Sequence, residues 1–145
     1  MFRILRKAEF FLSANSSENI RKYCYVGTQL NYTLAEKHCN TLDGVLFEPR
    51  NEEVNSIVYN ISNEVFGNGY QIWIGINDRE KEDSFVYTSN GDPVTYLNWS
   101  PNQPDDSTNE DCVEFRPSFG DAMWNDFHCE YESQSICEKS STSND

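Results

Sequence analysis

The chain has 145 residues, the size of one ordinary domain. Its 24 acidic residues against 11 lysines and arginines give a formal net charge of −13. This balance excludes non-specific binding to nucleic acid or to anionic lipid, because both need clustered cations. Nine Phe, eight Tyr and three Trp are more aromatic residues than a disordered chain carries. No apolar run approaches the ~18 residues of a membrane-spanning helix.

Residues 1–20 are expected to form a loosely ordered arm in front of one domain at residues 21–139, with residues 140–145 as a flexible tail. The apolar run Phe10–Leu12 is too short for the core of a secretory signal. The arm is therefore either an extension of the domain or what is left after a signal has been removed. The run Tyr23–Val26, near the start of the domain, favours a short strand.

Two helices are predicted in the first half of the domain. Thr33 and Glu36 have the spacing of a capping box and predict the start of a helix that ends at Gly44. Its expected apolar side chains are Leu34, Ala35, Cys39 and Leu42. A second helix is predicted between Pro49 and Gly67, because five apolar residues recur there at the spacing of one helical face. These five are Val54, Ile57, Val58, Ile61 and Val65.

The pattern changes at residue 70 to short strands separated by polar loops. Strands are predicted at residues 71–76, 85–87, 112–116, 122–124 and 135–138. Residues 89–109 form a long polar stretch, which in a compact domain is either functional or disordered. Trp99 within this stretch and Cys112 after it favour a functional loop held at both ends. Two helices followed by strands predict an α+β fold, with Trp73, Trp99 and Trp124 in its core.

Five cysteines and four glycosylation sequons favour an oxidising, secreted setting. The cysteines are Cys24, Cys39, Cys112, Cys129 and Cys137, and the sequons begin at Asn15, Asn31, Asn60 and Asn98. No Cys-x-x-Cys pair occurs and the chain has only two His, so a structural zinc site is not expected. An odd number leaves one cysteine over, whose thiol is either buried or part of an intermolecular disulfide.

Carboxylates and side-chain amides gather at residues 78–83, 103–111 and 125–126. Calcium takes about six to eight oxygen ligands from such groups, whereas softer metals favour the His and Cys that these loops lack. Four carboxylates crowd into one short loop, where their repulsion favours a bound cation: Asp105, Asp106, Glu110 and Asp111. The alternative is a solvated acidic loop that binds no metal.

Four short motifs occur in a characteristic order. They are Trp73-Ile74-Gly75-Ile76, Gln103-Pro104-Asp105, Glu110-Asp111-Cys112 and Trp124-Asn125-Asp126. Together with the order of the cysteines, they make the chain resemble the C-type lectin domain from about Lys22 to Lys139. The resemblance implies a C-type lectin-like α+β fold, with two helices packed on short antiparallel strands and a long calcium-binding loop region. It implies a binding domain rather than an enzyme, and no Gly-x-Ser-x-Gly nucleophile signature occurs.

The resemblance also implies which cysteines pair. The family pattern joins Cys39 to Cys137 and Cys112 to Cys129. Cys24 matches a family cysteine whose usual partner lies upstream, where this chain has no cysteine. A homodimer linked through Cys24 is therefore one hypothesis, and a buried thiol is the other.

Two calcium sites follow from matching the family's ligands to this chain, position by position. The principal site comprises Gln103, Asp105, Glu110, Asn125 and Asp126. An auxiliary site comprises Asp78, Glu82, Asp106 and Asp111, with Glu110 as a candidate for both sites. Pro104 follows a cis peptide bond in the family, which aims the side chains on either side of it at one ion.

In the family, two neighbouring sugar hydroxyls complete the calcium shell and hydrogen-bond to the residues that ligate the ion. The order Gln-Pro-Asp resembles the galactose type, whereas the mannose type has Glu-Pro-Asn. The implied partner is terminal galactose or N-acetylgalactosamine on glycans, held by the principal-site residues. Galactose-type members often place a Trp shortly after this motif, and residues 106–109 contain no aromatic. Phe119 or Phe127 is a substitute stacking residue, with ordinary packing as the alternative for each.

Two other functions compete with sugar binding, because a fold alone does not determine function. The first is a calcium-dependent domain of the same fold that recognises a protein, mineral or ice surface. The second is a structural disulfide module whose metal sites are vestigial. His128 is interpreted as structural rather than catalytic.

Overall fold

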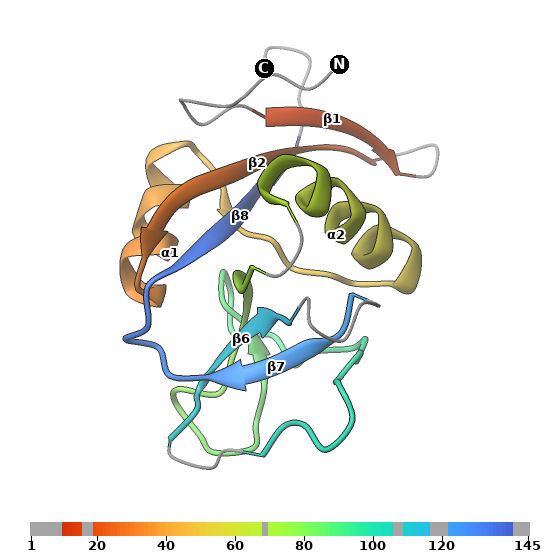
Figure 1. Ribbon diagram of the computed structural model, residues 1–145. Coiled ribbons are helices and arrows are strands. Elements are labelled where there is room, and N and C mark those ends of the chain that lie inside the picture. The colour runs from red at the N-terminus through yellow and green to blue at the C-terminus, as the bar shows by residue number, and fades with distance from the viewer. Residues whose placement is uncertain (1–9, 16–18, 68–69, 106–108, 117–121, 141–145) are drawn as a thin grey trace.

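The computed structural model describes residues 10–15, 19–67, 70–105, 109–116 and 122–140. In chain order its elements are β1 (Phe10–Asn15), β2 (Asn19–Leu30), α1 (Tyr32–Thr41), β3 (Val45–Leu46), α2 (Glu52–Phe66), β4 (Ile72–Asn77), β5 (Val86–Tyr87), β6 (Cys112–Phe115), β7 (Trp124–Phe127) and β8 (Ser133–Ser140). In Figure 1, β2 and β8 run side by side with α1 and α2 on either side of them, and β6 and β7 lie beyond, near the long loops. This is the α+β arrangement that the sequence predicts.

The described strands form one sheet in the order β1-β2-β8-β4-β6-β7, with β3 beside β8 and β5 beside β4. The pairing of β4 with β8 is parallel, and the other pairs are antiparallel. In the register of β6 and β7, Cys112 lies opposite Phe127 and Phe115 lies opposite Trp124. The strand predicted at residues 122–124 lies further along the chain, because pairing with β6 places β7 at Trp124–Phe127. This register brings Asn125 and Asp126 into the sheet beside β6.

Part of the N-terminal segment forms a strand at the edge of the sheet. Phe10–Asn15 forms β1 and pairs antiparallel with β2, which extends well beyond the predicted run Tyr23–Val26. The pairing has a physical reason, since β2 is bordered by β8 on one side and β1 satisfies the backbone groups on its other edge. Residues 1–9, 16–18 and 141–145, which complete the predicted arm and tail, lie outside the described residues.

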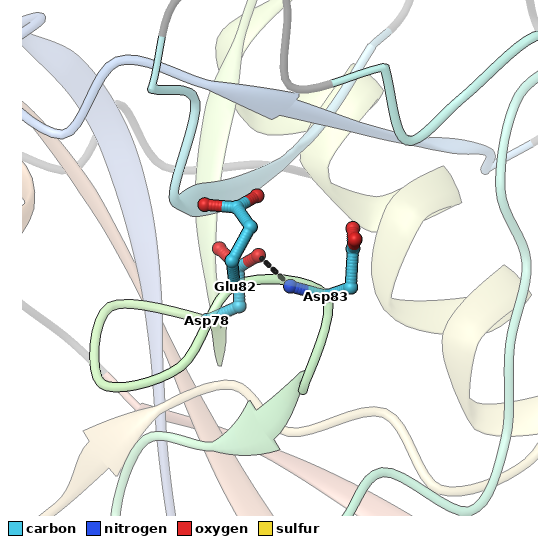
Figure 2. A group of neighbouring side chains, drawn as sticks. All are labelled: Asp78, Glu82 and Asp83. Carbon is cyan, nitrogen blue, oxygen red and sulfur yellow. Dashed lines mark hydrogen bonds between the residues drawn. The ribbon is translucent and has the colours of Figure 1, made fainter.

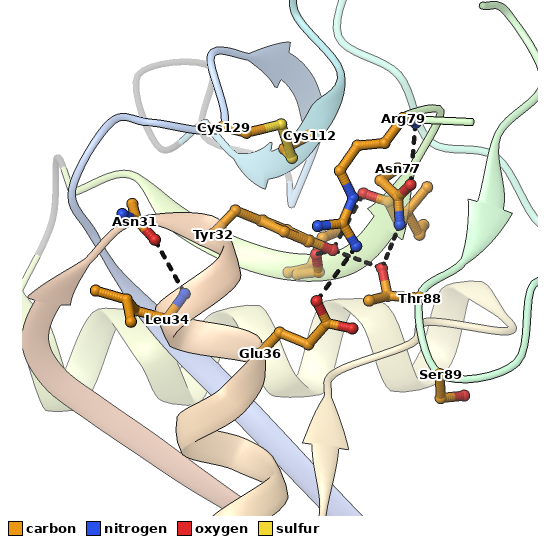
Figure 3. A network of polar contacts seen from close by, with 12 residues as sticks. Asn31, Tyr32, Leu34, Glu36, Asn77, Arg79, Thr88, Ser89, Cys112 and Cys129 are labelled. Carbon is orange, nitrogen blue, oxygen red and sulfur yellow. Dashed lines mark hydrogen bonds and ion pairs between the residues drawn. A yellow bond between two sulfur atoms is a disulfide. The ribbon is translucent and has the colours of Figure 1, made fainter. Parts of the chain in front are cut away.

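The helix α1 begins two residues earlier than the capping-box spacing predicts. Its N-cap is Asn31, whose side-chain oxygen accepts a hydrogen bond from the backbone N–H of Leu34 at 2.9 Å (Figure 3). Thr33 is therefore inside the helix. The buried residues of α1 are Tyr32, Ala35 and Cys39, whereas Leu34 is 46% exposed and does not belong to the buried face. An earlier start adds an aromatic side chain to that face.

The helix α2 confirms the second predicted helix. Asn51 caps its first turn by accepting from the N–H of Val54 at 2.9 Å, and Gly67 ends it with φ of +90°. Val54 and Val58 are buried, and Ile61 and Val65 pack against the core. Ile57 is the exception at 38% exposure, so the buried stripe is narrower than the sequence pattern.

The three tryptophans lie in or against the core, as predicted. Trp73 and Trp124 have no exposed surface, and Trp99 packs edge-on against Trp124 with ring centroids 5.7 Å apart. Backbone hydrogen bonds join the long loop to β7, from Ser100 N to the Trp124 carbonyl at 2.8 Å and from Trp124 N to the Asn98 carbonyl at 2.9 Å. The middle of the loop is thereby attached to the sheet close to the acidic residues that follow it.

Candidate metal centre

Three carboxylates of the predicted principal site meet at one place. Asp105, Glu110 and Asp126 each offer one oxygen, and these oxygens lie within 4.8 Å of one another. Asp105 comes from the long loop, Glu110 from the segment before β6, and Asp126 from β7. We call this group the acidic cage. Glu110 and Asp126 are 7% and 0% exposed, so water screens little of their mutual repulsion.

The backbone of the long loop supports this arrangement. The N–H of Asp105 donates to Oδ1 of Asp126 at 3.1 Å, which ties the loop to β7. The peptide bond between Gln103 and Pro104 is cis, as the resemblance implies. The Gln103 side-chain amide lies 3.4 Å from Oδ2 of Asp105 and donates to it. The amide of Gln103 and the carboxylate of Asp105, both expected ligands of the metal, therefore lie next to each other.

Asn125 is buried beside the cage and has a carboxylate partner that the sequence did not indicate. Its Nδ2 donates to Oε2 of Glu114 at 3.1 Å, and Nε2 of Gln71 donates to the same oxygen at 2.9 Å. Glu114 has no exposed surface, and burial raises its pKa to about 8, while the hydrogen bonds from Asn125 and Gln71 oppose the rise. A charged residue between buried Val113 and Phe115 is the sequence signal that could have identified it.

A second acidic group forms in the loop after β4. Asp78, Glu82 and Asp83 each offer an oxygen within 4.8 Å of the others, and Figure 2 shows Glu82 close to Asp78. The Asp83 N–H donates to Oδ2 of Asp78 at 2.9 Å, and the Asp78 N–H donates to the Asp111 carbonyl at 3.0 Å. Asp83 was not among the predicted ligands, although it belongs to the acidic run 78–83.

Asp111 and Asp106 are the other two residues predicted for the auxiliary site. Asp111 is adjacent to this group through its backbone, and its side-chain Oδ1 is buried without a hydrogen-bond partner. Such an oxygen suits a cation, since an unpaired buried acceptor is otherwise unfavourable. Asp106 lies outside the described residues, so the structure does not test its assignment.

A polar network attaches α1 to the strand that carries the second acidic group (Figure 3). The Tyr32 hydroxyl lies 2.8 Å from the Ile74 carbonyl, to which it donates, and 2.6 Å from Oγ1 of Thr88. Oγ1 of Thr88 also accepts from Asn77 at 2.8 Å, and Arg79 pairs with Glu36 of α1 at 3.2 Å. These contacts fix the end of β4, where the acidic loop begins.

Both implied disulfides are present in the structure. Cys39 is bonded to Cys137, and Cys112 is bonded to Cys129. The second disulfide is close to the acidic cage in sequence, since Cys112 follows Glu110 by two residues. Cys24 lies outside both disulfides and has no exposed surface. Its burial favours the hypothesis of a buried thiol and opposes an intermolecular disulfide, because an enclosed sulfur cannot reach a second chain.

Of the two phenylalanines considered as stacking residues, Phe127 lies within the described residues. Phe119 lies outside the described residues. Phe127 is partly buried against the cluster that contains Cys112, and its ring packs against His128 and Tyr131 at centroid distances of 5.2 and 5.1 Å. Ordinary packing therefore accounts for Phe127.

Comparisons with known proteins agree with this architecture. The Lectin C-type domain family model matches residues 28–139. The chain is 35% identical over 128 residues to Collectin-10 of Mus musculus, covering 86% of this chain and 44% of that protein. It is 34% identical over 126 residues to the alpha-N-acetylgalactosamine-specific lectin of Patiria pectinifera, covering 83% of this chain and 74% of that one. The chain therefore spans less than half of Collectin-10 and about three quarters of the Patiria lectin.

Solved structures show the same fold. The carbohydrate-recognition domain of the mouse scavenger receptor C-type lectin has a TM-score of 0.77 and 25% identity, covering 89% of this chain and 95% of that one. A calcium-independent type II antifreeze protein has a TM-score of 0.75 at 23% identity, covering 91% and 98%. Among the described residues, no helix is both long and apolar enough to cross a membrane. The family match over most of the chain and the shared fold show that this chain belongs to the C-type lectin domain family, which is not an enzyme family.

Proposed function

We propose that this domain is a calcium-dependent lectin that prefers galactose or N-acetylgalactosamine. The observation that carries the proposal is the acidic cage, in which three carboxylates, two of them buried, converge from three separate segments. Carboxylates held this close repel one another, and a divalent cation removes that repulsion. Since the cage offers oxygen ligands only, a hard cation such as Ca²⁺ fits it better than zinc.

The residues around the cage supply enough oxygens for part of a calcium shell. Asp105, Glu110 and Asp126 contribute carboxylates, and Gln103 and Asn125 contribute amide oxygens. Calcium takes about six to eight oxygens, so positions remain for two neighbouring hydroxyls of a sugar. Each hydroxyl would donate to a carboxylate and accept from an amide, so that the arrangement of amides and acids selects the orientation of the sugar. Asp78, Glu82, Asp83 and Asp111 would hold an auxiliary ion.

The preference for galactose is inferred from residue order. Gln103 places an amide donor where mannose-type members have a glutamate, and Asp105 places an acceptor where they have an asparagine. The hydrogen bond from Nε2 of Gln103 to Oδ2 of Asp105 at 3.4 Å supports this inference, because it holds the amide next to a carboxylate of the cage. The similarity to a lectin named as specific for alpha-N-acetylgalactosamine supports the same preference.

A secreted setting is part of the proposal. Two disulfides have formed, and such bonds persist in oxidising compartments. A shallow site of this kind binds a single sugar at about the millimolar level, near −4 kcal/mol. Useful avidity then requires several sites on one assembly. Because Cys24 is buried, we expect contacts other than a Cys24 disulfide to provide that assembly.

The alternative is a domain of the same fold that recognises a protein, mineral or ice surface. One feature of the sequence favours it: no aromatic residue follows the Gln103–Asp105 motif up to Asn109. The fold is also shared with a calcium-independent antifreeze protein, so fold similarity does not select sugar.

A glycan array with and without chelator separates the two functions. The protein should bind galactose-terminated glycans in millimolar Ca²⁺ and lose them in EDTA. Asp126→Asn should abolish the binding, since it weakens the cage, whereas Asp92→Asn in an exposed turn is the matched control. Binding that persists in EDTA would refute the calcium-bridged mechanism. An array that stays blank in Ca²⁺, while calorimetry shows that the ion binds, would favour the alternative.

A further inference from the structure

An aromatic surface lies next to the acidic cage, formed by Phe127, His128 and Tyr131. We call it the aromatic ledge. The His128 and Tyr131 rings pack on Phe127, tilted in the first case and edge-on in the second. Phe127 is partly buried and anchors the other two, because it packs against the cluster around Cys112 and Cys129. The His128 side chain is 42% exposed and Tyr131 is 47% exposed, so both present ring surface to solvent.

Three connections hold the ledge against the cage. Phe127 directly follows Asp126, a member of the cage, in β7. Nε2 of His128 lies 4.0 Å from Oε2 of Glu110, another member. The Cys112–Cys129 disulfide joins the segment of the ledge to the start of β6, two residues after Glu110. The ledge is therefore a fixed neighbour of the cage.

The internal geometry of the ledge is also fixed. The backbone N–H of Tyr131 donates to the His128 carbonyl at 3.1 Å, which closes a turn between the two residues whose rings contact Phe127. The N–H of Tyr32 donates to the carbonyl of Cys129 at 2.9 Å, which attaches the turn to α1. A rigid aromatic surface loses little conformational entropy when a ligand covers it.

The chemistry of the ledge suits the apolar face of a sugar. One face of a galactose-type pyranose presents C–H groups, and aromatic rings pack favourably against such a surface. The rings of His128 and Tyr131 both contact Phe127, at centroid distances of 5.2 and 5.1 Å, so the three rings form one continuous aromatic surface. Exposed Glu130 and Glu132 flank Tyr131 and supply acceptors for sugar hydroxyls.

We propose that the ledge is a saccharide subsite continuous with the cage, and that the preferred ligand is a galactose-terminated disaccharide or longer glycan rather than a single sugar. His128 contacts the sugar held at the ion, and Tyr131 contacts the next sugar along the glycan. This inference rests on the proposed function, since the cage must first hold the terminal sugar.

The test compares a monosaccharide with a disaccharide. Calorimetric titrations with methyl β-galactoside and with lactose are made in Ca²⁺ on the wild type, His128→Ala, Tyr131→Ala and Tyr70→Ala. Tyr70 is a matched control because it is an aromatic residue of similar exposure, 43%, that lies before β4 and does not belong to the ledge. Calcium affinity of each variant is measured without sugar, and thermal unfolding confirms that each one is folded.

Tyr131→Ala should weaken lactose about three- to tenfold and leave methyl β-galactoside unchanged, because only the second sugar loses its contact. His128→Ala should weaken both sugars by a similar factor, and His128→Phe should restore them. Calcium affinity should stay within about twofold in all variants, since none removes a ligand of the ion. Tyr70→Ala should match the wild type throughout.

Equal lactose affinities for Tyr131→Ala and Tyr70→Ala would overturn the ledge subsite while the proposed lectin function still stands. A fall in calcium affinity of His128→Ala equal to its fall in sugar affinity would also overturn the subsite at His128, because the residue would then act through the ion. If the wild type binds calcium but neither sugar, the proposed function itself fails, and the ledge proposal fails with it.

Discussion

Glu138 in β8 is a buried carboxyl group, 3% exposed, whose ionisation should oppose folding. The hydrogen bonds and charges around Glu138 compensate only in part for the loss of water around its carboxylate. Oε1 accepts from the N–H of Glu48 at 3.2 Å and lies 3.9 Å from the Arg21 guanidinium, beyond hydrogen-bond distance. Glu48 is also buried and is itself paired with Arg50 at 3.1 Å. Burial is the main reason that the pKa of Glu138 rises from 4.5 to about 7, with Arg21 opposing the rise.

The raised pKa of Glu138 determines how the free energy of unfolding changes with pH. Because the pKa of Glu138 is higher in the folded chain than in the unfolded chain, the folded state binds the proton more tightly. The contribution of Glu138 to the free energy of unfolding is fully present below pH 4.5 and is lost as the pH rises through 7. The difference between 4.5 and about 7 corresponds to about 3 kcal/mol.

Glu138→Gln tests this reasoning, because glutamine has nearly the same shape and stays neutral at every pH. Its amide oxygen can still accept from the Glu48 N–H. The variant should equal the wild type within about 1 kcal/mol near pH 4.5 and exceed its stability by up to about 3 kcal/mol at pH 8. Urea unfolding followed by Trp fluorescence in EDTA, between pH 4.5 and 8.5, measures the difference without a contribution from metal.

Glu132→Gln, at an exposed glutamate one residue before β8, is the control and should differ from the wild type by about 0.5 kcal/mol or less at all pH values. A Glu138→Gln variant that is less stable than the wild type at pH 8 would refute the reasoning. It would mean that the ion pair with Arg21 outweighs the desolvation of the carboxylate.

Three further predictions concern the site and the cysteines. Gln103→Glu combined with Asp105→Asn should shift the glycan profile towards mannose, and an unchanged array profile would contradict the donor and acceptor argument. Replacing Cys112 and Cys129 by Ala should lower the free energy of unfolding by about 3 kcal/mol, because the disulfide restricts the entropy of a loop of this length in the unfolded chain. The same change should weaken calcium binding measured by calorimetry, and full calcium affinity would show that the cage does not need the disulfide. Cys24 should not cross-link chains, so a monomer band is expected on gels without reductant, and a dimer band that reductant removes would show that this thiol becomes exposed.

Sequence alone was sufficient for features that depend on local spacing or on short motifs. The apolar period of residues 54–65 predicted α2, since one face of a helix repeats every 3.6 residues whatever it packs against. The motifs around Gln103 and Asn125 identified the family and implied both disulfides, which the structure contains. Strand bounds were less accurate, as at β7, because register depends on the partner strand.

Tertiary structure alone decided the features that depend on residues distant in sequence. The burial of Cys24 follows from packing between β1, β8 and α1, and no local pattern carries it. The contact of Glu114 with Asn125 arises because the two residues lie opposite each other on β6 and β7. The contact of His128 with Glu110 arises because the Cys112–Cys129 disulfide joins the segment after β7 to the start of β6. The physical reason is that a side chain's burial, charge state and partners are set by whichever segments the fold brings within a few ångströms of it.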